Sequence, residues 1–330
     1  MGKLVILVLA AALVWSGYWF WGARTTERAI TEQLDTMRAA GWQIDVQSQE
    51  TRGFPNRFDT TFDEVKVTTP GGLTLVAPFF QLLALSYRPN QVIAALPPQI
   101  GLESVLGTAI ITNDKARASM TVQPSPRLPL DHSSLVVDGL AVESAGRTLR
   151  IGQLRFATRL PEGAPDPSHQ NIGLAVENVV LPDTLMEQLD AAGLGAIEAL
   201  RLDATIELDA PLDRSALETP PAPQRIELHD LSLDWGDVTV EADGAVDVTA
   251  ANQPEGELLL TVNDWRDALR VAVALGLVPE AQRSAVQQGL TLLSGLSGSG
   301  ELSLPLVFDA GRMSLGPIPL GPAPVITFGG

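Results

Sequence analysis

The chain has 330 residues and a net charge of -17, so it can form one large domain or two, and it would be repelled by a nucleic-acid backbone. The absence of cysteine excludes disulfides, thiol catalysis and zinc sites built on thiolates. Because of the negative net charge, nucleic acid is not an expected partner. Aromatic residues are few and the apolar content is mostly aliphatic, which favours a sheet-rich body.

The first segment, Leu4 to Ala23, contains no charged residue. As a helix it would be about 30 Å long, which is roughly the thickness of the hydrocarbon core of a membrane. Residues that favour the headgroup layer gather at its far end: Trp15, Tyr18, Trp19 and Trp21. We therefore predict a transmembrane signal anchor over residues 1–23, with these four side chains at the membrane interface and the lipid bilayer as a partner.

A cleaved signal peptide is the alternative interpretation of this segment. Cleavage requires small residues just after a short apolar run, whereas a cut after Ala23 would put Trp21 at a small-residue position. We prefer the uncleaved anchor.

The orientation of the anchor rests on flanking charge. Lys3 and the terminal amine nearly balance Arg24, Arg28 and Arg38 in the positive-inside rule. Because short N-terminal tails usually stay in the cytoplasm, we predict a single-pass protein of the bacterial inner membrane with its body in the periplasm.

A juxtamembrane helix is predicted over residues 24–41. Ile30, Leu34 and Met37 form one apolar stripe, and Gly41 is a suitable stop. We expect this helix to hold the body away from the membrane.

Beyond the helix, the pattern apolar-x-apolar-x-x-apolar-x-apolar occurs six times. A spacing of three between two alternating pairs is what a β-bulge produces, because one inserted residue bends the strand and keeps its apolar set on the core side. The pattern therefore predicts a strongly curved sheet. The six sets are Thr60-Phe62-Val65-Val67, Leu135-Val137-Leu140-Val142, Leu149-Ile151-Leu154-Phe156, Leu174-Val176-Val179-Leu181, Ile226-Leu228-Leu231-Leu233 and Met313-Leu315-Ile318-Leu320.

Turn residues separate the alternating segments and predict an antiparallel meander. They are 70–72 (Pro-Gly-Gly), 145–146 (Ala-Gly), 235–237 (Trp-Gly-Asp) and 243–244 (Asp-Gly). The expected fold class is mainly β with a minor α+β character. An N-terminal transmembrane helix is followed by a curved, bulged antiparallel sheet that forms a groove, a half-barrel or a sandwich, with a few packing helices.

Three of those helices lie after residue 180. A short one is predicted from Asp183 to Ala192. A helical pair is predicted over 263–295, the first helix from the cap candidate Asn263 to Gly276 and the second from Pro279 to near Gly295. We expect the pair to pack on the concave face of the sheet or to close one end.

Two Pro-rich stretches, 160–170 and 218–225, have the composition of linkers or lobe boundaries. We predict two β-rich lobes, 42–160 and 161–330, the second containing the helical pair. The Pro-interrupted C-terminal residues are expected at a sheet edge or as a surface tail.

Catalytic and metal-binding patterns are not found in the sequence. His132, His169 and His229 lie in separate segments, so no metal site is predicted. The glycine-containing stretches 193–198, 242–247 and 294–300 lack the spacing of dinucleotide, calcium or serine-nucleophile motifs. We therefore predict no cofactor and no enzymatic activity.

Two stretches, "GFPNRFD" at 53–59 and "FDAGRMSLGPIPLGPAP" at 308–324, carry a family resemblance. With the N-terminal anchor and the late helical pair, they resemble an uncharacterised family of alphaproteobacterial envelope proteins, classed as a domain of unknown function. The strand style also looks like that of AsmA-type envelope proteins, which implies a curved β-groove associated with lipid transport or outer-membrane assembly. Neither resemblance implies catalytic residues.

Two functions fit these features. The first is a protein that holds or passes a lipid acyl chain, with phospholipid as ligand, in an apolar groove. The candidate groove-lining residues are Phe58, Phe62, Leu231, Leu233 and Trp235. The second is a non-catalytic scaffold or assembly factor with a fully packed core and other envelope proteins as partners.

Overall fold

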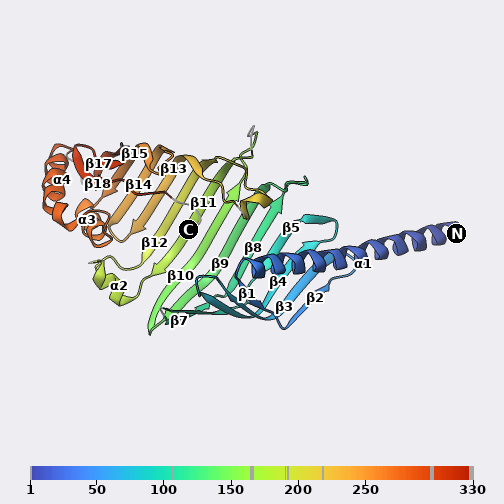
Figure 1. Cartoon of the computed structure of the whole chain (residues 1–330). Coiled ribbons are helices and arrows are strands. Elements are labelled where there is room, and N and C mark those ends of the chain that lie inside the picture. Colours follow the sequence, from blue (N-terminus) through green and yellow to red (C-terminus); the bar gives the residue numbers. More distant parts are fainter. Residues whose placement is uncertain are drawn as a thin grey trace. The chain divides into compact units, whose positions relative to one another are not determined.

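Antiparallel strands dominate the chain, and the predicted fold class is confirmed (Figure 1). The computed structural model describes residues 2–105, 107–163, 167–189, 191, 193–217, 219–297 and 301–326. The chain forms two compact units: unit 1 comprises residues 1–122 and 135–146, and unit 2 comprises residues 123–134 and 147–330. The lobes 42–160 and 161–330 stay a prediction.

Unit 1 contains helix α1 and an antiparallel sheet. β3 (Arg57–Thr68) pairs on one side with β1 (Gln43–Asp45) and β2 (Ser48–Arg52), and on the other with β4 (Thr74–Leu85). β4 then pairs with β5 (Arg88–Ala95) at one end and with β6 (Gln99–Ser104) at the other. β5 also pairs with β8 (Lys115–Val122), and β6 pairs with β7 (Gly107–Thr112). β9 (Leu130–Ser144) pairs with β7.

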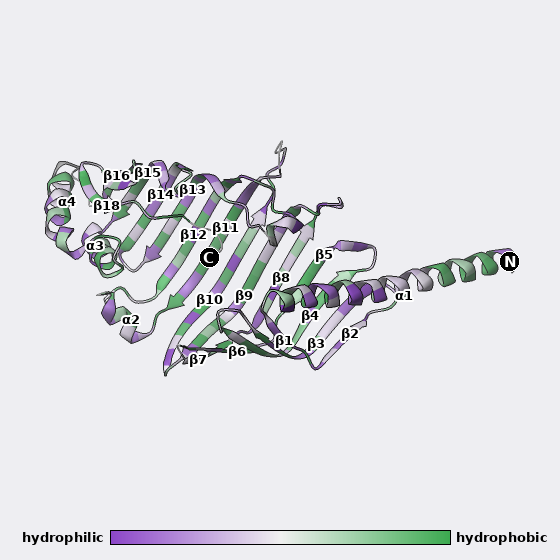
Figure 2. Cartoon of the chain, viewed as in Figure 1, coloured by the Kyte–Doolittle hydropathy of each residue, from purple (hydrophilic) through white to green (hydrophobic). Residues whose placement is uncertain are grey.

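Helix α1 (Gly2–Ala39) is one continuous element that joins the predicted anchor to the predicted juxtamembrane helix. Within the described residues it is the one helix long and apolar enough to cross a membrane. Figure 2 shows its apolar N-terminal part and the more polar part that follows. Ile30 and Leu34 pack on a buried cluster of the unit 1 sheet that includes Phe62 and Val65, as the predicted stripe requires.

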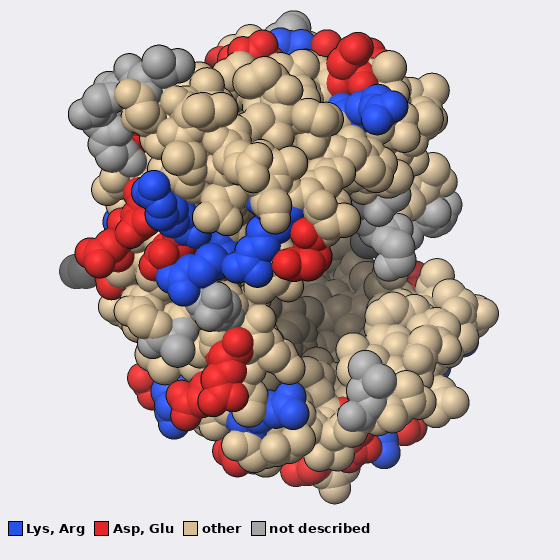
Figure 3. Space-filling view, turned by 90° about the vertical axis from the view of Figure 1, so that its left-hand side faces the viewer, with Lys and Arg blue, Asp and Glu red and all other residues tan. Residues whose placement is uncertain are grey.

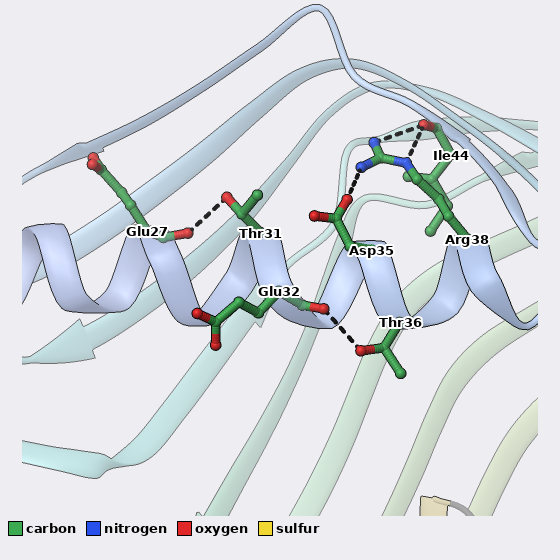
Figure 4. A network of polar contacts seen from close by, with 7 residues as sticks. All are labelled: Glu27, Thr31, Glu32, Asp35, Thr36, Arg38 and Ile44. Atoms are coloured by element: carbon green, nitrogen blue, oxygen red, sulfur yellow. Dashed lines mark hydrogen bonds and ion pairs between the residues drawn. The ribbon is translucent and has the colours of Figure 1, made fainter.

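The later part of α1 thus packs along the unit 1 sheet, and the expectation that it holds the body away from the membrane stays a prediction. At its end, Gly41 has φ 92°, and the Trp42 N–H donates to the Met37 oxygen, so the glycine does stop the helix. The Arg38 guanidinium donates to Asp35 and to the Ile44 oxygen of β1 (Figure 4). These bonds fix the C-terminal turn of α1 against the first strand.

Unit 2 contains a meander in which each strand pairs with the next. The strands are β10 (Arg147–Arg159), β11 (His169–Val180), β12 (Ile197–Leu208), β13 (Pro223–Trp235), β14 (Val238–Val248), β15 (Pro254–Asn263), β16 (Glu301–Asp309), β17 (Arg312–Leu315) and β18 (Ile318–Pro322). Among the described residues β18 pairs with β17 alone, so the Pro-containing C-terminal strand lies at a sheet edge.

The first of the six strand patterns keeps its apolar residues on one face, as predicted, but by a different route. Phe62 and Val65 are both buried. Asp63 pairs with Phe79 and Val65 with Ala77, so neither strand carries an inserted residue between these pairs. Glu64 instead adopts a left-handed φ of 48° and turns the strand locally. The bulge predicted at this position is therefore wrong, although the inward facing is right.

The same left-handed conformation occurs in two further sets. The second linking residue has φ 62° at Gly139 and 55° at Asn178. Gly152 lies opposite Asn178 between paired residues of β10 and β11, and a Cβ on Gly152 would lie 3.0 Å from the Asn178 Cβ. The glycine therefore makes room for the distortion on the neighbouring strand.

β13 carries the predicted bulge, and it appears in both of its strand pairs. The register with β14 shifts between Leu228 and Leu231, and the register with β12 shifts at the same place. The last set is not a strand at all: Leu315 pairs with Ile318, so β17 and β18 form a hairpin around residues 316–317. Apolar spacing alone does not distinguish a bulge from a two-residue turn.

The predicted turn at Asp243-Gly244 is also wrong, because both residues lie inside β14. Gly244 has φ 136°, and a Cβ there would lie 2.5 Å from the Glu257 oxygen of β15. The glycine is required by close strand contact beside the β13 bulge, which a sequence pattern cannot separate from a turn.

The helices of unit 2 lie near the predicted positions. α2 spans Asp183–Gln188, and Ala192, the predicted end, lies outside the described residues. α3 spans Trp265–Ala274 with Asp264 rather than Asn263 as its cap. Pro279 precedes the short 3-10 helix Glu280–Gln282, and α4 follows over Arg283–Ser297. The other 3-10 turn is Arg214–Leu217.

Candidate functional site

Helices α3 and α4 cover one part of the unit 2 sheet. α3 contacts β14 and α4 contacts β16. Each helix turns an apolar stripe inward: Trp265 and Leu269 of α3 and Val286 and Leu290 of α4 are buried in one cluster. Figure 3 faces the end of unit 2 that carries these helices, where uncharged residues cover broad areas between clusters of charged side chains.

A cavity of about 380 Å³ lies beneath these helices. Its volume is within the range of roughly 300–1,000 Å³ that is typical of small-molecule sites. Every lining residue is apolar. They are Leu194, Leu233, Trp235, Val238, Val240, Leu260, Val262, Trp265, Ala268, Leu269, Val271, Ala272, Leu275, Leu277, Val278, Val286, Leu290, Leu302, Leu304, Leu306, Met313, Leu315 and Leu320.

The cavity exists because small side chains occupy the inward face of α3. Ala268 and Ala272 are one turn apart and both line it, beside Val271 and Leu275. α4 approaches the sheet closely at Gly289, where a Cβ would lie 2.6 Å from the Ile318 Cδ1. One helix therefore lies tight on the sheet while the other leaves space beneath it.

Polar groups close to the cavity are satisfied elsewhere. The Trp235 indole N–H donates to the Gly195 oxygen at 3.0 Å, so its ring presents hydrocarbon to the cavity. On α3, Arg270 pairs with Asp267 at 2.6 Å, and the Arg266 guanidinium lies over the Trp265 ring, 4.3 Å from its centre. A ligand inside the cavity would therefore meet hydrocarbon, the indole rings and the thioether of Met313.

Two exposed side chains mark the outer edge of the cavity. Leu275 and Leu277 line it, yet they are 56% and 62% exposed. They lie on either side of Gly276, whose φ of 75° ends α3. This loop is the most exposed part of the lining.

The five predicted groove residues occupy different places. Leu233 and Trp235 line the cavity, whereas Leu231 packs on a neighbouring cluster around Ala204, Leu228 and Ala242. Phe58 and Phe62 belong to unit 1, where Phe58 is buried with Trp19 and Ala23 of α1. The structure thus brings two of the five to this site.

Most of the lining was not singled out as a site by sequence. The available signal was the amphipathic pair around Leu269 and Leu290, which was predicted to pack on the sheet. The pattern did not reveal that Ala268 and Ala272 face the sheet and leave a cavity there.

The four predicted interface residues lie on α1. Trp15 and Tyr18 donate to the backbone oxygens of Pro55 and Ser86 at 2.9 and 2.7 Å. Trp19 is buried, whereas Trp21 is 68% exposed.

No cluster of three or more potential metal ligands occurs in the part of the chain that the structure describes. His132 contacts Asp131, His229 contacts Thr205, and His169 lies 3.8 Å from Glu207. Stretch 294–300 lies partly outside the described residues.

The carboxylates with displaced pKa values are exposed and do not belong to the cavity lining. The hydrogen bond from Arg52 lowers the pKa of Glu50, and those from Ser215 lower the pKa of Asp213.

No curated protein and no solved structure matches the chain in sequence comparison. The likeness to AsmA-type proteins and the alphaproteobacterial source therefore stay predictions. A family model does match, over residues 19–324, which include the contacts of Trp19, Ile30 and Leu34 with the unit 1 sheet and the whole cavity lining. The chain belongs to that family, DUF2125, described as an uncharacterized protein conserved in bacteria.

Proposed function

We propose that this protein is a membrane-anchored, periplasmic component of the bacterial cell envelope that binds a lipid acyl chain in the apolar cavity of unit 2. Phospholipid is the proposed ligand class. The observation that carries the proposal is the cavity of about 380 Å³ whose lining contains no charged or polar residue.

The chemistry of the lining selects an alkyl chain. Burial of apolar groups contributes about 0.8 kcal/mol for each methylene, so ten methylenes would contribute about 8 kcal/mol before the cost of ordering. A polar ligand would lose its hydration and gain no hydrogen bond from these side chains. The headgroup would stay at the exposed edge formed by Leu275 and Leu277.

The anchor supports the proposal by supplying proximity to lipid. α1 contains the candidate span, and a lipid-binding unit tethered to a bilayer has its ligand at high local concentration. The role of the protein is then binding or transfer, without chemistry on the lipid.

The test is native mass spectrometry with lipid extraction on the full chain, purified in detergent, with a variant that fills the cavity. Ala272→Leu adds a side chain to the lining, whereas Ala274→Leu makes the same change on an exposed position of the same helix. We expect bound phospholipid in the natural chain and in Ala274→Leu, and severalfold less in Ala272→Leu. Equal lipid in both variants, or none in any, would exclude the cavity as the site.

A scaffold or assembly factor is the second candidate. Its supporting observation is Leu292, which is 73% exposed on α4 and would be covered by a protein partner from the envelope. Cross-linking at this position together with an empty cavity would favour this function.

A further inference from the structure

We propose that unit 1 is itself seated in the membrane interface, through an aromatic collar around the point where α1 meets the sheet. The collar consists of Trp15, Tyr18, Phe20, Trp21, Phe54 and Tyr87. The inference rests on the membrane anchoring in the proposed function, and it is independent of the cavity in unit 2.

The first observation is the division of α1 into a free part and a fixed part. Residues 4–14 are exposed throughout. From Trp15 onward the helix is bonded to unit 1, where Trp15 reaches the Pro55 oxygen and the Trp19 indole donates to the Arg57 oxygen at 2.8 Å. Gly22 lies against the Phe58 ring, where a Cβ would be 2.6 Å from the ring tip.

The free part is too short to cross a bilayer alone. Residues 4–14 form about 16 Å of helix, roughly half of the hydrocarbon core of about 30 Å. Uncharged sequence continues to Ala23, and Arg24 is the first charged residue after Lys3. A spanning helix therefore draws the first fixed residues, from Trp15 onward, to the membrane interface, and local thinning of the bilayer accommodates the remaining mismatch. The loops of unit 1 that are bonded to these residues follow to the same depth.

The two loops of unit 1 that contact α1 have a composition suited to the membrane interface. One is residues 53–56 between β2 and β3, and the other is residues 86–87 between β4 and β5; Ser86 joins them through its N–H bond to the Asn56 oxygen at 2.9 Å. Their tips carry Phe54 and Tyr87, which are 52% and 59% exposed. Exposed aromatic side chains at one edge favour the headgroup layer.

The collar is preassembled rather than a set of separate rings. Phe54 stacks on Phe20 with centroids 6.0 Å apart and meets Trp19 edge-to-face at 5.5 Å. The Tyr18 hydroxyl holds the second loop through the Ser86 oxygen. Arg57 and Arg88 follow the two tips in sequence, where guanidinium groups can reach lipid phosphates. Helix and loops therefore form one membrane-facing surface.

The natural absence of cysteine makes a depth measurement direct, since one introduced cysteine is the single labelling site. We would place an environment-sensitive fluorophore on Phe54→Cys, Tyr87→Cys, Leu9→Cys and Leu73→Cys in the full chain. Leu73 is exposed in the turn at the opposite end of the β3–β4 hairpin, and Leu9 lies in the free part of α1. Each variant is reconstituted into vesicles of phosphatidylethanolamine and phosphatidylglycerol that contain nitroxide-labelled lipid.

We expect severalfold stronger quenching by shallow nitroxides at positions 54 and 87 than at 73, and the strongest quenching by deep nitroxides at 9. If 54 and 87 behave like 73 while 9 is deep, the anchor is real and the collar proposal is overturned. If 9 is also water-exposed, the anchoring itself fails, and the collar fails with it. Lipid in the cavity is measured separately, so the two proposals fail in different ways.

Discussion

Unit 1 and unit 2 use the same construction, an antiparallel sheet covered by helix, but they attach the helix differently. α1 is fixed to unit 1 by directional bonds from Trp15, Tyr18, Trp19 and Arg38 to backbone oxygens. The described contacts of α3 and α4 with the unit 2 sheet are mostly aliphatic. Hydrogen bonds define one distance and angle, whereas aliphatic contact is non-directional and tolerates change. The first arrangement suits a rigid attachment of α1 to the unit 1 sheet, and the second suits a site that admits a ligand.

The largest effect is expected from a change that weakens the attachment of α1 to the unit 1 sheet. Trp19→Ala removes a buried indole and its bond to the Arg57 oxygen. We expect the free energy of unfolding to fall by about 3–5 kcal/mol, measured by urea denaturation in detergent. Trp21→Ala, at an exposed position two residues further along the helix, should change the free energy of unfolding by less than about 0.5 kcal/mol. Equal effects would show that α1 does not pack on the sheet.

A second change sharpens the comparison from the side of unit 2. Leu290→Ala removes a buried side chain that lines the cavity, and it should cost about 2–5 kcal/mol, whereas the exposed Leu292→Ala should be nearly neutral. Because the enlarged cavity can be filled, added phospholipid should restore part of the lost stability. The measurement is the melting temperature with and without lipid. If added phospholipid raised the melting temperature of Trp19→Ala as much as that of Leu290→Ala, the lipid effect would not be specific to the cavity of unit 2.

The smallest effects concern exposed carboxylates, one in each unit. The pKa values of Glu50 and Asp213 lie below their ordinary values of 4.5 and 3.8, through hydrogen bonds from Arg52 and Ser215 respectively. A depressed folded pKa stabilises the fold above the unfolded pKa, and this contribution is lost as the pH falls through the folded pKa.

Glu50→Gln and Asp213→Asn should therefore lower the melting temperature slightly near neutral pH, and the difference should disappear as the pH falls through the folded pKa of each group. Because both groups are solvent-exposed, the two shifts should be similarly small. A large shift in one unit only would mean that surface charge, rather than the packing of helices, separates the two units.

The sequence predicted the elements better than their irregularities. The uncharged run from Leu4, the stripe through Ile30 and Leu34 and the stop at Gly41 were sufficient to predict α1. The meander and the helical pair followed from alternation and turn residues. These features are local, and periodicity reports them directly.

What could not be predicted depends on neighbours in space. Glu64 and Asn178 adopt left-handed conformations opposite matched residues on the next strand, so the inferred inserted residue was absent there. Gly244 resembles a turn residue until β15 is placed beside it. The cavity likewise depends on whether α3 turns the face with Ala268 and Ala272 toward the sheet. The attachment of α1 to unit 1 depends on bonds to backbone oxygens, which have no sequence signal.

In the proposed membrane-spanning arrangement, the continuity of α1 makes the orientation of unit 1 depend on bilayer thickness. A helix longer than the hydrocarbon core accommodates the difference by tilting. Since α1 runs without a break from Gly2 to Ala39 and is fixed to β1 at its far end, unit 1 must turn with it as a lever arm. A change in bilayer thickness would therefore change the angle between unit 1 and the lipid surface.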